Sequence, residues 1–90
     1  AAASIVAMPS RWESFGLATA EALASARPVI GFADCPGTNE LVRHEFNGWL
    51  VEGGGDRVRH LESGLRRLMS DASLRVELGS RGPSSVAHFG

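Results

Sequence analysis

Three short apolar runs recur along the chain, and a segment with helical character follows each of them. Residues 4–8, 28–32 and 49–51 are apolar almost without interruption, and runs of this length with β-branched residues predict strands. Residues 16–26 are apolar on most faces of a helix, which predicts a helix buried between layers. Apolar strands that alternate with helices are typical of a parallel sheet covered on both faces. The pattern therefore predicts an α/β fold of the Rossmann-like, three-layer kind with a partial parallel sheet.

The second half of the chain carries one clear amphipathic helix. Asp56 is placed to cap it, and residues 57–71 are expected to form it because apolar residues recur there at helical spacing: Val58, Leu61, Leu65, Leu68 and Met69. One or two further helical turns are expected over 72–79, before two glycines and a proline interrupt the pattern.

Shorter features connect these elements. Thr38 is expected to cap one or two helical turns over 38–43, and Asn47-Gly48 indicates a turn before the third strand. The glycine-rich segment 52–56 indicates a flexible turn before a helix. It superficially resembles a phosphate-binding loop, but that motif requires a lysine and the chain has none.

The size of the chain points to part of a domain. It has 90 residues, enough for one small domain, and it enters an apolar run almost at once. Three strands make a narrow sheet with a long unpaired edge. Residues 1–90 are therefore interpreted as a single partial domain, and pairing with a copy of itself through that edge would be an artefact of truncation.

Composition and charge exclude several classes of protein. Apolar residues make up 43% and charged residues 21%, as in ordinary soluble globular proteins. The net charge of −1 gives no electrostatic footprint for nucleic acid. The arginine-rich segment 57–67 is most simply a solvated helix face, although it leaves peripheral membrane association of a full-length enzyme open. Residues 1–8 are too short an apolar run for a signal peptide or a membrane span.

The cysteine and the histidines give no sign of a metal or redox centre. Cys35 is the only cysteine and is interpreted as a small, partly buried hydrophobe; this usage fits a reducing compartment and predicts a cytoplasmic protein. The three histidines, His44, His60 and His88, are too scattered for a metal motif and are assigned structural or surface roles. No metal or other cofactor is expected.

Two carboxylates frame the start of the first predicted helix. Glu13 precedes the helix and Glu21 lies inside it, with seven residues between them. The helix start offers free N–H groups and a positive dipole end that suit a phosphate, and Gly16 lets a ligand approach the backbone. Carboxylates on either side accept hydroxyl groups, as on a sugar and a ribose. The alternative needs no ligand: Ser10 and Glu13 fit a capping box, and Glu21 gains from the helix dipole.

A longer pattern resembles a known family. The stretch SRWESFGLATAEALASARPVIGF, followed by GTNELV and FNGWLV, resembles the C-terminal nucleotide-sugar-binding domain of retaining GT-B glycosyltransferases of the family 4-like group. That family carries an E-x7-E motif of the form E-x-F-G-x-x-x-x-E-A-x-A, then x-P-V-[IV], G-x-x-E and N-G-x-L-V. The match covers roughly residues 4–70. The resemblance implies transfer of a hexosyl group from a nucleotide diphosphate sugar, such as a UDP- or GDP-sugar, to an acceptor hydroxyl.

The resemblance also implies roles for individual residues. Glu13 would hold hydroxyls of the donor sugar near the reacting centre and is the candidate catalytic residue, and Glu21 would bind the ribose. The backbone of Phe15, Gly16 and Leu17 would contact the sugar and the diphosphate, and Ala18 would add one amide. Glu40 matches the acid of G-x-x-E and is interpreted as a structural cap or loop anchor.

The match has gaps that keep a second hypothesis open. Ser25-Ala26 stands where the family often has Cys-Gly, so Ala26 would be strained if the helix end needs a left-handed backbone. Trp49 replaces a smaller aliphatic residue. The Arg and Lys that neutralise the diphosphate, and the N-terminal acceptor domain, belong to upstream segments, so the piece alone is expected to be inactive. The alternative is a non-catalytic nucleotide-binding or scaffold α/β domain whose acids only cap helices.

Overall fold

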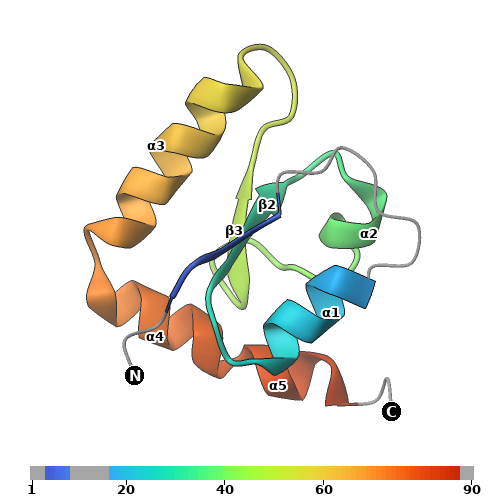
Figure 1. Ribbon diagram of the computed structural model, residues 1–90. Coiled ribbons are helices and arrows are strands. Elements are labelled where there is room, and N and C mark those ends of the chain that lie inside the picture. Colours follow the sequence, from blue (N-terminus) through green and yellow to red (C-terminus); the bar gives the residue numbers. More distant parts are fainter. Residues whose placement is uncertain (1–3, 9–16, 88–90) are drawn as a thin grey trace.

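The computed structural model describes residues 4–8 and 17–87, without the side chain of Leu17. Its elements follow one another in the order that Figure 1 shows. The strands are β1 (Val6–Met8), β2 (Val29–Phe32) and β3 (Gly48–Val51). The helices are α1 (Leu17–Ala24), α2 (Pro36–Asn39), α3 (Arg57–Met69), α4 (Ala72–Ser80) and α5 (Gly82–Ser85).

The three strands form one parallel sheet in the order β1-β2-β3. Val6 lies opposite Val29, and Val29 lies opposite Gly48, so consecutive strands are neighbours. All four residues of β2 are buried, as expected of the central strand in a sheet that is covered on both faces. The predicted α/β class and the partial parallel sheet are confirmed.

Side chains of β2 point alternately into two separate cores. On one face Val29 joins Leu23 of α1 and Val86, which follows α5. On the other face Ile30 joins Leu68 of α3 and Leu78 of α4. Helices therefore lie on both faces of the sheet, with α1, α2 and α5 on one side and α3 and α4 on the other (Figure 1). None of the helices in the part of the chain that the structure describes is long and apolar enough to cross a bilayer.

Helix α1 is buried on one side only, which corrects the prediction that it is covered on most faces. Thr19, Ala22 and Leu23 are buried, whereas Ala18 and Glu21 are exposed. The number of apolar residues in this segment was a misleading guide to burial, because the apolar residues on the exposed side of α1 are alanines. The small side chain of alanine does not require burial.

Helix α2 begins earlier than predicted, and Thr38 does not cap it. Cys35 is the N-cap residue and Pro36 is the first helical residue, where its fixed φ and missing N–H cost nothing. Thr38 lies inside the helix with 1% of its surface exposed. The N-cap of α3 is as predicted: the Asp56 side chain accepts a hydrogen bond from the Arg59 N–H at 3.1 Å.

The apolar stripe of α3 is narrower than its sequence spacing indicated. Leu68 is fully buried and Leu61 and Leu65 are half-buried, but Val58 and Met69 are 78% and 69% exposed. Gly64 takes part in the buried face, because a Cβ there would meet side chains of Ile30 and Val51 at 2.7 Å. The close approach of α3 to the sheet is therefore centred on a glycine, which a count of apolar residues does not detect.

Candidate functional site

The start of α1, which is the described part of the predicted donor-binding segment, follows β1 in the chain at the carboxyl edge of the sheet. Because the strands are parallel, the chain segments that follow β1, β2 and β3 all leave at this edge, where ligands bind in open α/β sheets. Glu13, Phe15 and Gly16 follow β1 and lie outside the described residues. The described part of the predicted site is the start of α1, with the backbone of Leu17 and the residues Ala18 and Glu21.

Ala18 and Glu21 lie on the open side of α1. They are three residues apart in a helix, so they are neighbours on one face, and both are exposed. Within the described residues, the first turn of α1 carries no acidic side chain that would offset the positive end of its dipole. The described part of the predicted site is thus accessible, while the geometry of the Glu13–Glu21 pair stays a prediction.

A buried polar chain fixes α1 against α2. Thr19 Oγ1 lies 3.4 Å from Thr38 Oγ1, and both side chains are fully buried. The Thr38 hydroxyl lies 3.5 Å from the Cys35 sulfur, to which it donates. These buried polar groups find their hydrogen-bond partners in one another rather than in water. Their contacts therefore help to set the position of the first turn of α1 relative to the loop after β2.

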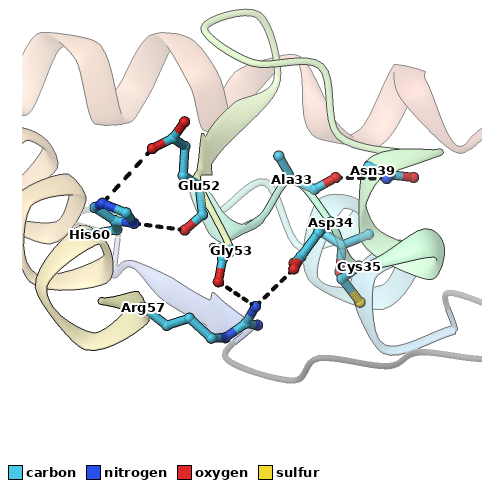
Figure 2. A network of polar contacts seen from close by, with 9 residues as sticks. Ala33, Asp34, Cys35, Asn39, Glu52, Gly53, Arg57 and His60 are labelled. Atoms are coloured by element: carbon cyan, nitrogen blue, oxygen red, sulfur yellow. Dashed lines mark hydrogen bonds and ion pairs between the residues drawn. The ribbon is translucent and has the colours of Figure 1, made fainter. Parts of the chain in front are cut away.

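Another cluster at the carboxyl edge was missed by the sequence interpretation. Arg57 Nη1 donates to Asp34 Oδ2 and to the Gly53 carbonyl, both at 2.9 Å (Figure 2). The guanidinium carbon lies 3.9 Å from the centre of the Phe32 ring. One side chain therefore ties the segment after β2, the segment after β3 and the start of α3 together.

This cluster corrects the interpretation of 57–67 as a uniformly solvated arginine face. The Arg57 side chain is only 15% exposed, and its Nη2 is buried without a hydrogen-bond partner in the described structure. Arg59 and Arg66 are 82% and 78% exposed, as expected of a solvated face. The sequence contained one indication that Arg57 differs from the other arginines, namely its position. Arg57 directly follows the N-cap residue and so lies where α3 meets the sheet edge.

Glu40 is the C-cap residue of α2, in agreement with the predicted structural role, but it acts through its backbone. It follows α2, its side chain is exposed, and only its backbone N–H takes a capping role, by donating to the Thr38 carbonyl. The anchor is Asn47, which is 2% exposed, accepts from the Arg43 N–H at 2.7 Å and donates to the Leu41 carbonyl at 3.0 Å. Asn47 had been assigned to a turn, because an Asn-Gly pair gives no hint of a buried amide.

Cys35, His44 and His60 have structural contacts, and His88 lies outside the described residues. Cys35 is free and fully buried. His44 and His60 each bond to the backbone near β3, which confirms a structural role for both. No three His, Cys, Asp or Glu side chains gather within residues 4–8 and 17–87 in a way that could hold a metal ion.

Two surface recesses lie away from α1. One, of about 440 Å³, lies between the end of α2 and α5 and includes Glu40 and Asn47 in its lining. The other, of about 370 Å³, lies between β3 and α3 and is lined by Trp49, His60 and Arg67 among others. Neither recess includes Ala18 or Glu21.

The parallel sheet with helices on both faces defines a Rossmann-like domain. The family model of glycosyl transferases group 1 matches residues 1–85 of the chain. The protein therefore belongs to that family of glycosyltransferases.

Individual relatives agree with this assignment. The D-inositol 3-phosphate glycosyltransferase of Salinispora tropica is 47% identical over 88 residues, which are 98% of this chain and 18% of that protein. The chain spans about a fifth of the length of the first curated relatives that it matches.

Solved structures show the same fold. Anabaena HepE, solved in complex with UDP, matches 94% of this chain and 23% of its own, with a TM-score of 0.79 and 26% identity. The C-terminal domain of the group 1 glycosyl transferase LpcC from Francisella tularensis matches 93% of this chain and 42% of its own, with a TM-score of 0.74 and 32% identity. The resemblance to GT-B glycosyltransferases is thereby confirmed in family and fold, and a C-terminal placement of the chain is consistent with it.

Proposed function

We propose that the full-length protein is a retaining glycosyltransferase that moves a hexosyl group from a nucleotide diphosphate sugar to an acceptor hydroxyl. The observation that carries this proposal is the family match over residues 1–85, together with relatives that bear glycosyltransferase names. The UDP complex of HepE supports a uridine nucleotide as the first donor to test. The acceptor domain is expected to belong to the part of the protein beyond this chain.

The chemistry assigns one task to each predicted group. Glu13 accepts hydrogen bonds from hydroxyls of the donor sugar and stabilises positive charge that develops at the reacting carbon. The backbone N–H groups of Phe15, Gly16 and Leu17, with that of Ala18, bind the diphosphate, whose negative charge grows as it leaves. Glu21 accepts the ribose hydroxyls. The exposure of Glu21 supports its part of this assignment.

Turnover by the full-length protein tests the proposal. The expected result is release of UDP from UDP-glucose when acceptor sugars and polyols are supplied, with D-inositol 3-phosphate as the first acceptor because several relatives are named for it. Nuclear magnetic resonance of the product should show that the anomeric configuration of the sugar is kept.

A pair of variants separates the enzyme from a non-catalytic nucleotide-binding domain. Glu13→Gln should lower turnover by about a hundredfold or more, since it removes one preorganised charge at the reacting centre. Glu62→Gln, an exposed change in α3, is the matched control. Binding of UDP without turnover of any nucleotide sugar would favour the non-catalytic alternative. Turnover equal in Glu13→Gln and wild type would instead contradict the role given to Glu13.

A further inference from the structure

One buried side chain anchors the first turn of α1. Among the described side chains at positions 18–20, Thr19 is fully buried, Ala20 is half-buried and Ala18 is exposed. Leu17 and Ala18, whose backbone N–H groups are predicted to bind the diphosphate, directly precede Thr19 in the helix. A shift of Thr19 would therefore move both of these N–H groups.

Thr38 of α2 is the polar partner of Thr19. These are the only two threonines in the chain, and their Oγ1 atoms lie 3.4 Å apart where α2 lies beside the start of α1 (Figure 1). Both side chains are fully buried, so each hydroxyl depends on protein groups for its hydrogen bonds. A buried polar contact is directional and specifies one arrangement of the two helices more narrowly than a contact between apolar side chains would.

Thr38 is itself fixed to the sheet. A Cβ atom on Gly31 of β2 would lie 2.7 Å from Thr38 Cγ2, so the methyl group of Thr38 packs closely on the bare backbone of that glycine. The Asn39 amide donates to the Ala33 carbonyl at 2.7 Å, which ties α2 to the segment after β2 (Figure 2). The two branches of the Thr38 side chain thus have separate tasks: the methyl group seats α2 on the sheet, and the hydroxyl group meets α1.

We propose that Thr38 is a positioning residue for the nucleotide-sugar donor. Its hydroxyl, through Thr19, holds the first turn of α1 where the N–H groups of Leu17 and Ala18 meet the diphosphate. This inference rests on the proposed function, because it takes the start of α1 as part of the donor site. Thr38 is buried and acts only through Thr19. Its contribution is preorganisation: the apparent affinity for the donor falls with the fraction of molecules in which the turn is in place.

Two substitutions separate the tasks of the Thr38 side chain. Thr38→Val keeps the shape of the side chain and its contact with Gly31 but leaves the Thr19 hydroxyl facing an apolar group. It should bind UDP about fivefold to tenfold more weakly than wild type, the equivalent of about one hydrogen bond. Thr38→Ser keeps the hydroxyl and loses the buried methyl group. It should bind UDP within about twofold of wild type, although it should unfold at a lower urea concentration.

Calorimetric titration of the full-length variants with UDP, or with GDP if UDP does not bind, measures the affinity. Urea unfolding without nucleotide measures the stability of the same variants. Val51→Ala, in the core on the α3 side of the sheet, is the control for a loss of stability alone and should bind the nucleotide like wild type.

A double substitution tests whether the two threonines act as a pair. Thr19→Val removes the same contact from the α1 side and should weaken nucleotide binding as Thr38→Val does, which also provides the measurement if Thr38→Val does not fold. With both changes together, the two hydroxyls are replaced by apolar groups of the same shape and neither is left without its partner. The double variant should therefore bind the nucleotide no more weakly than either single variant.

Three outcomes overturn this proposal and leave the proposed function intact. The first is equal nucleotide affinity of wild type and Thr38→Val. The second is an affinity that follows the urea midpoint, so that Thr38→Ser and Val51→Ala bind as weakly as Thr38→Val. The third is a double variant in which the losses of the two single valine substitutions multiply. A wild type that binds neither UDP nor GDP would instead overturn the proposed function, and this proposal with it.

Discussion

Ala26 and Gly79 meet backbone to backbone: a Cβ atom on Gly79 would lie 2.5 Å from the carbonyl oxygen of Ala26. Ala26 itself has a φ of +61°, the left-handed conformation that a glycine adopts freely. The sequence had indicated that alanine would be strained here if α1 ended in this way, and the structure confirms it. The end of α1, which sets the direction of the predicted ribose-binding helix, is thus held by its contact with α4.

Replacing Ala26 by glycine should stabilise the protein. A left-handed residue other than glycine costs about 1–2 kcal/mol, and glycine loses about 0.5–1 kcal/mol of that gain through the entropy of the unfolded chain. The expected net gain is therefore about 0.5–1 kcal/mol in urea unfolding of the full-length protein. Ala24→Gly, in the helical and exposed last residue of α1, is the control and should destabilise by about 1 kcal/mol. Equal effects of the two changes would contradict this explanation of Ala26.

Replacing Gly79 by alanine should have the opposite effect. The nearest atoms to the new Cβ belong to the backbone of Ala26 and Pro28, which cannot turn aside as a side chain can. Overpacking of this kind costs about 1–3 kcal/mol. Gly54→Ala provides the control, because no heavy atom lies within 4 Å of a Cβ there, and it should change the unfolding free energy by less than about 0.5 kcal/mol. An unaltered urea midpoint for Gly79→Ala would show that α4 can move away from α1.

The sequence could predict those parts of the fold that depend on one local stretch of the chain. Apolar runs located the three strands, and Asp56 located the start of α3, because a carboxylate before a helix caps it. The burial of Arg57 could not be predicted. Its partner Asp34 comes from the loop after β2, 23 residues away in sequence, and only the parallel order of the strands brings that loop to the edge where α3 begins. The same is true of Asn47, whose amide also donates to the Ser85 hydroxyl, 38 residues away in sequence.

Replacement of Arg57 by lysine, the other cationic side chain, should destabilise the protein. Arg57→Lys keeps the charge but loses the planar group that stacks on Phe32 while donating to Asp34 and Gly53. We expect a loss of about 1–2 kcal/mol in the unfolding free energy, the sum of a stacking and a hydrogen-bond contribution. Arg59→Lys, two residues further along α3 and 82% exposed, should be neutral within error. A comparable loss in both variants would assign the effect to the helix rather than to the cluster.

Asp71 should make the free energy of unfolding depend on pH in the acidic range. Its carboxylate caps α4 by accepting from the Leu74 N–H at 2.9 Å, and this bond, with the Arg67 side chain, lowers the pKa of Asp71 below its ordinary value. The folded protein therefore holds this proton less tightly than the unfolded chain. The stabilisation that the ionised Asp71 contributes is fully present above about pH 4, the ordinary pKa of an Asp side chain. It is lost as pH falls through the lowered pKa of the folded protein.

Asp71→Asn and Asp71→Ser test this acid dependence, because both keep a capping oxygen without a titrating group. The difference in urea midpoint between wild type and either variant should shrink between about pH 7 and about pH 3. A difference that stays constant over this range would show that the charge of Asp71 does not contribute.

The central claim, that α1 binds the nucleotide of a sugar donor, is tested most directly by calorimetric titration of the full-length protein with UDP. Loss of a charge-assisted hydrogen bond of about 1.5 kcal/mol or more predicts that Glu21→Gln binds UDP about tenfold or more weakly than wild type. The exposed Glu62→Gln should bind like wild type. Equal affinity of wild type and Glu21→Gln for UDP would contradict the claim.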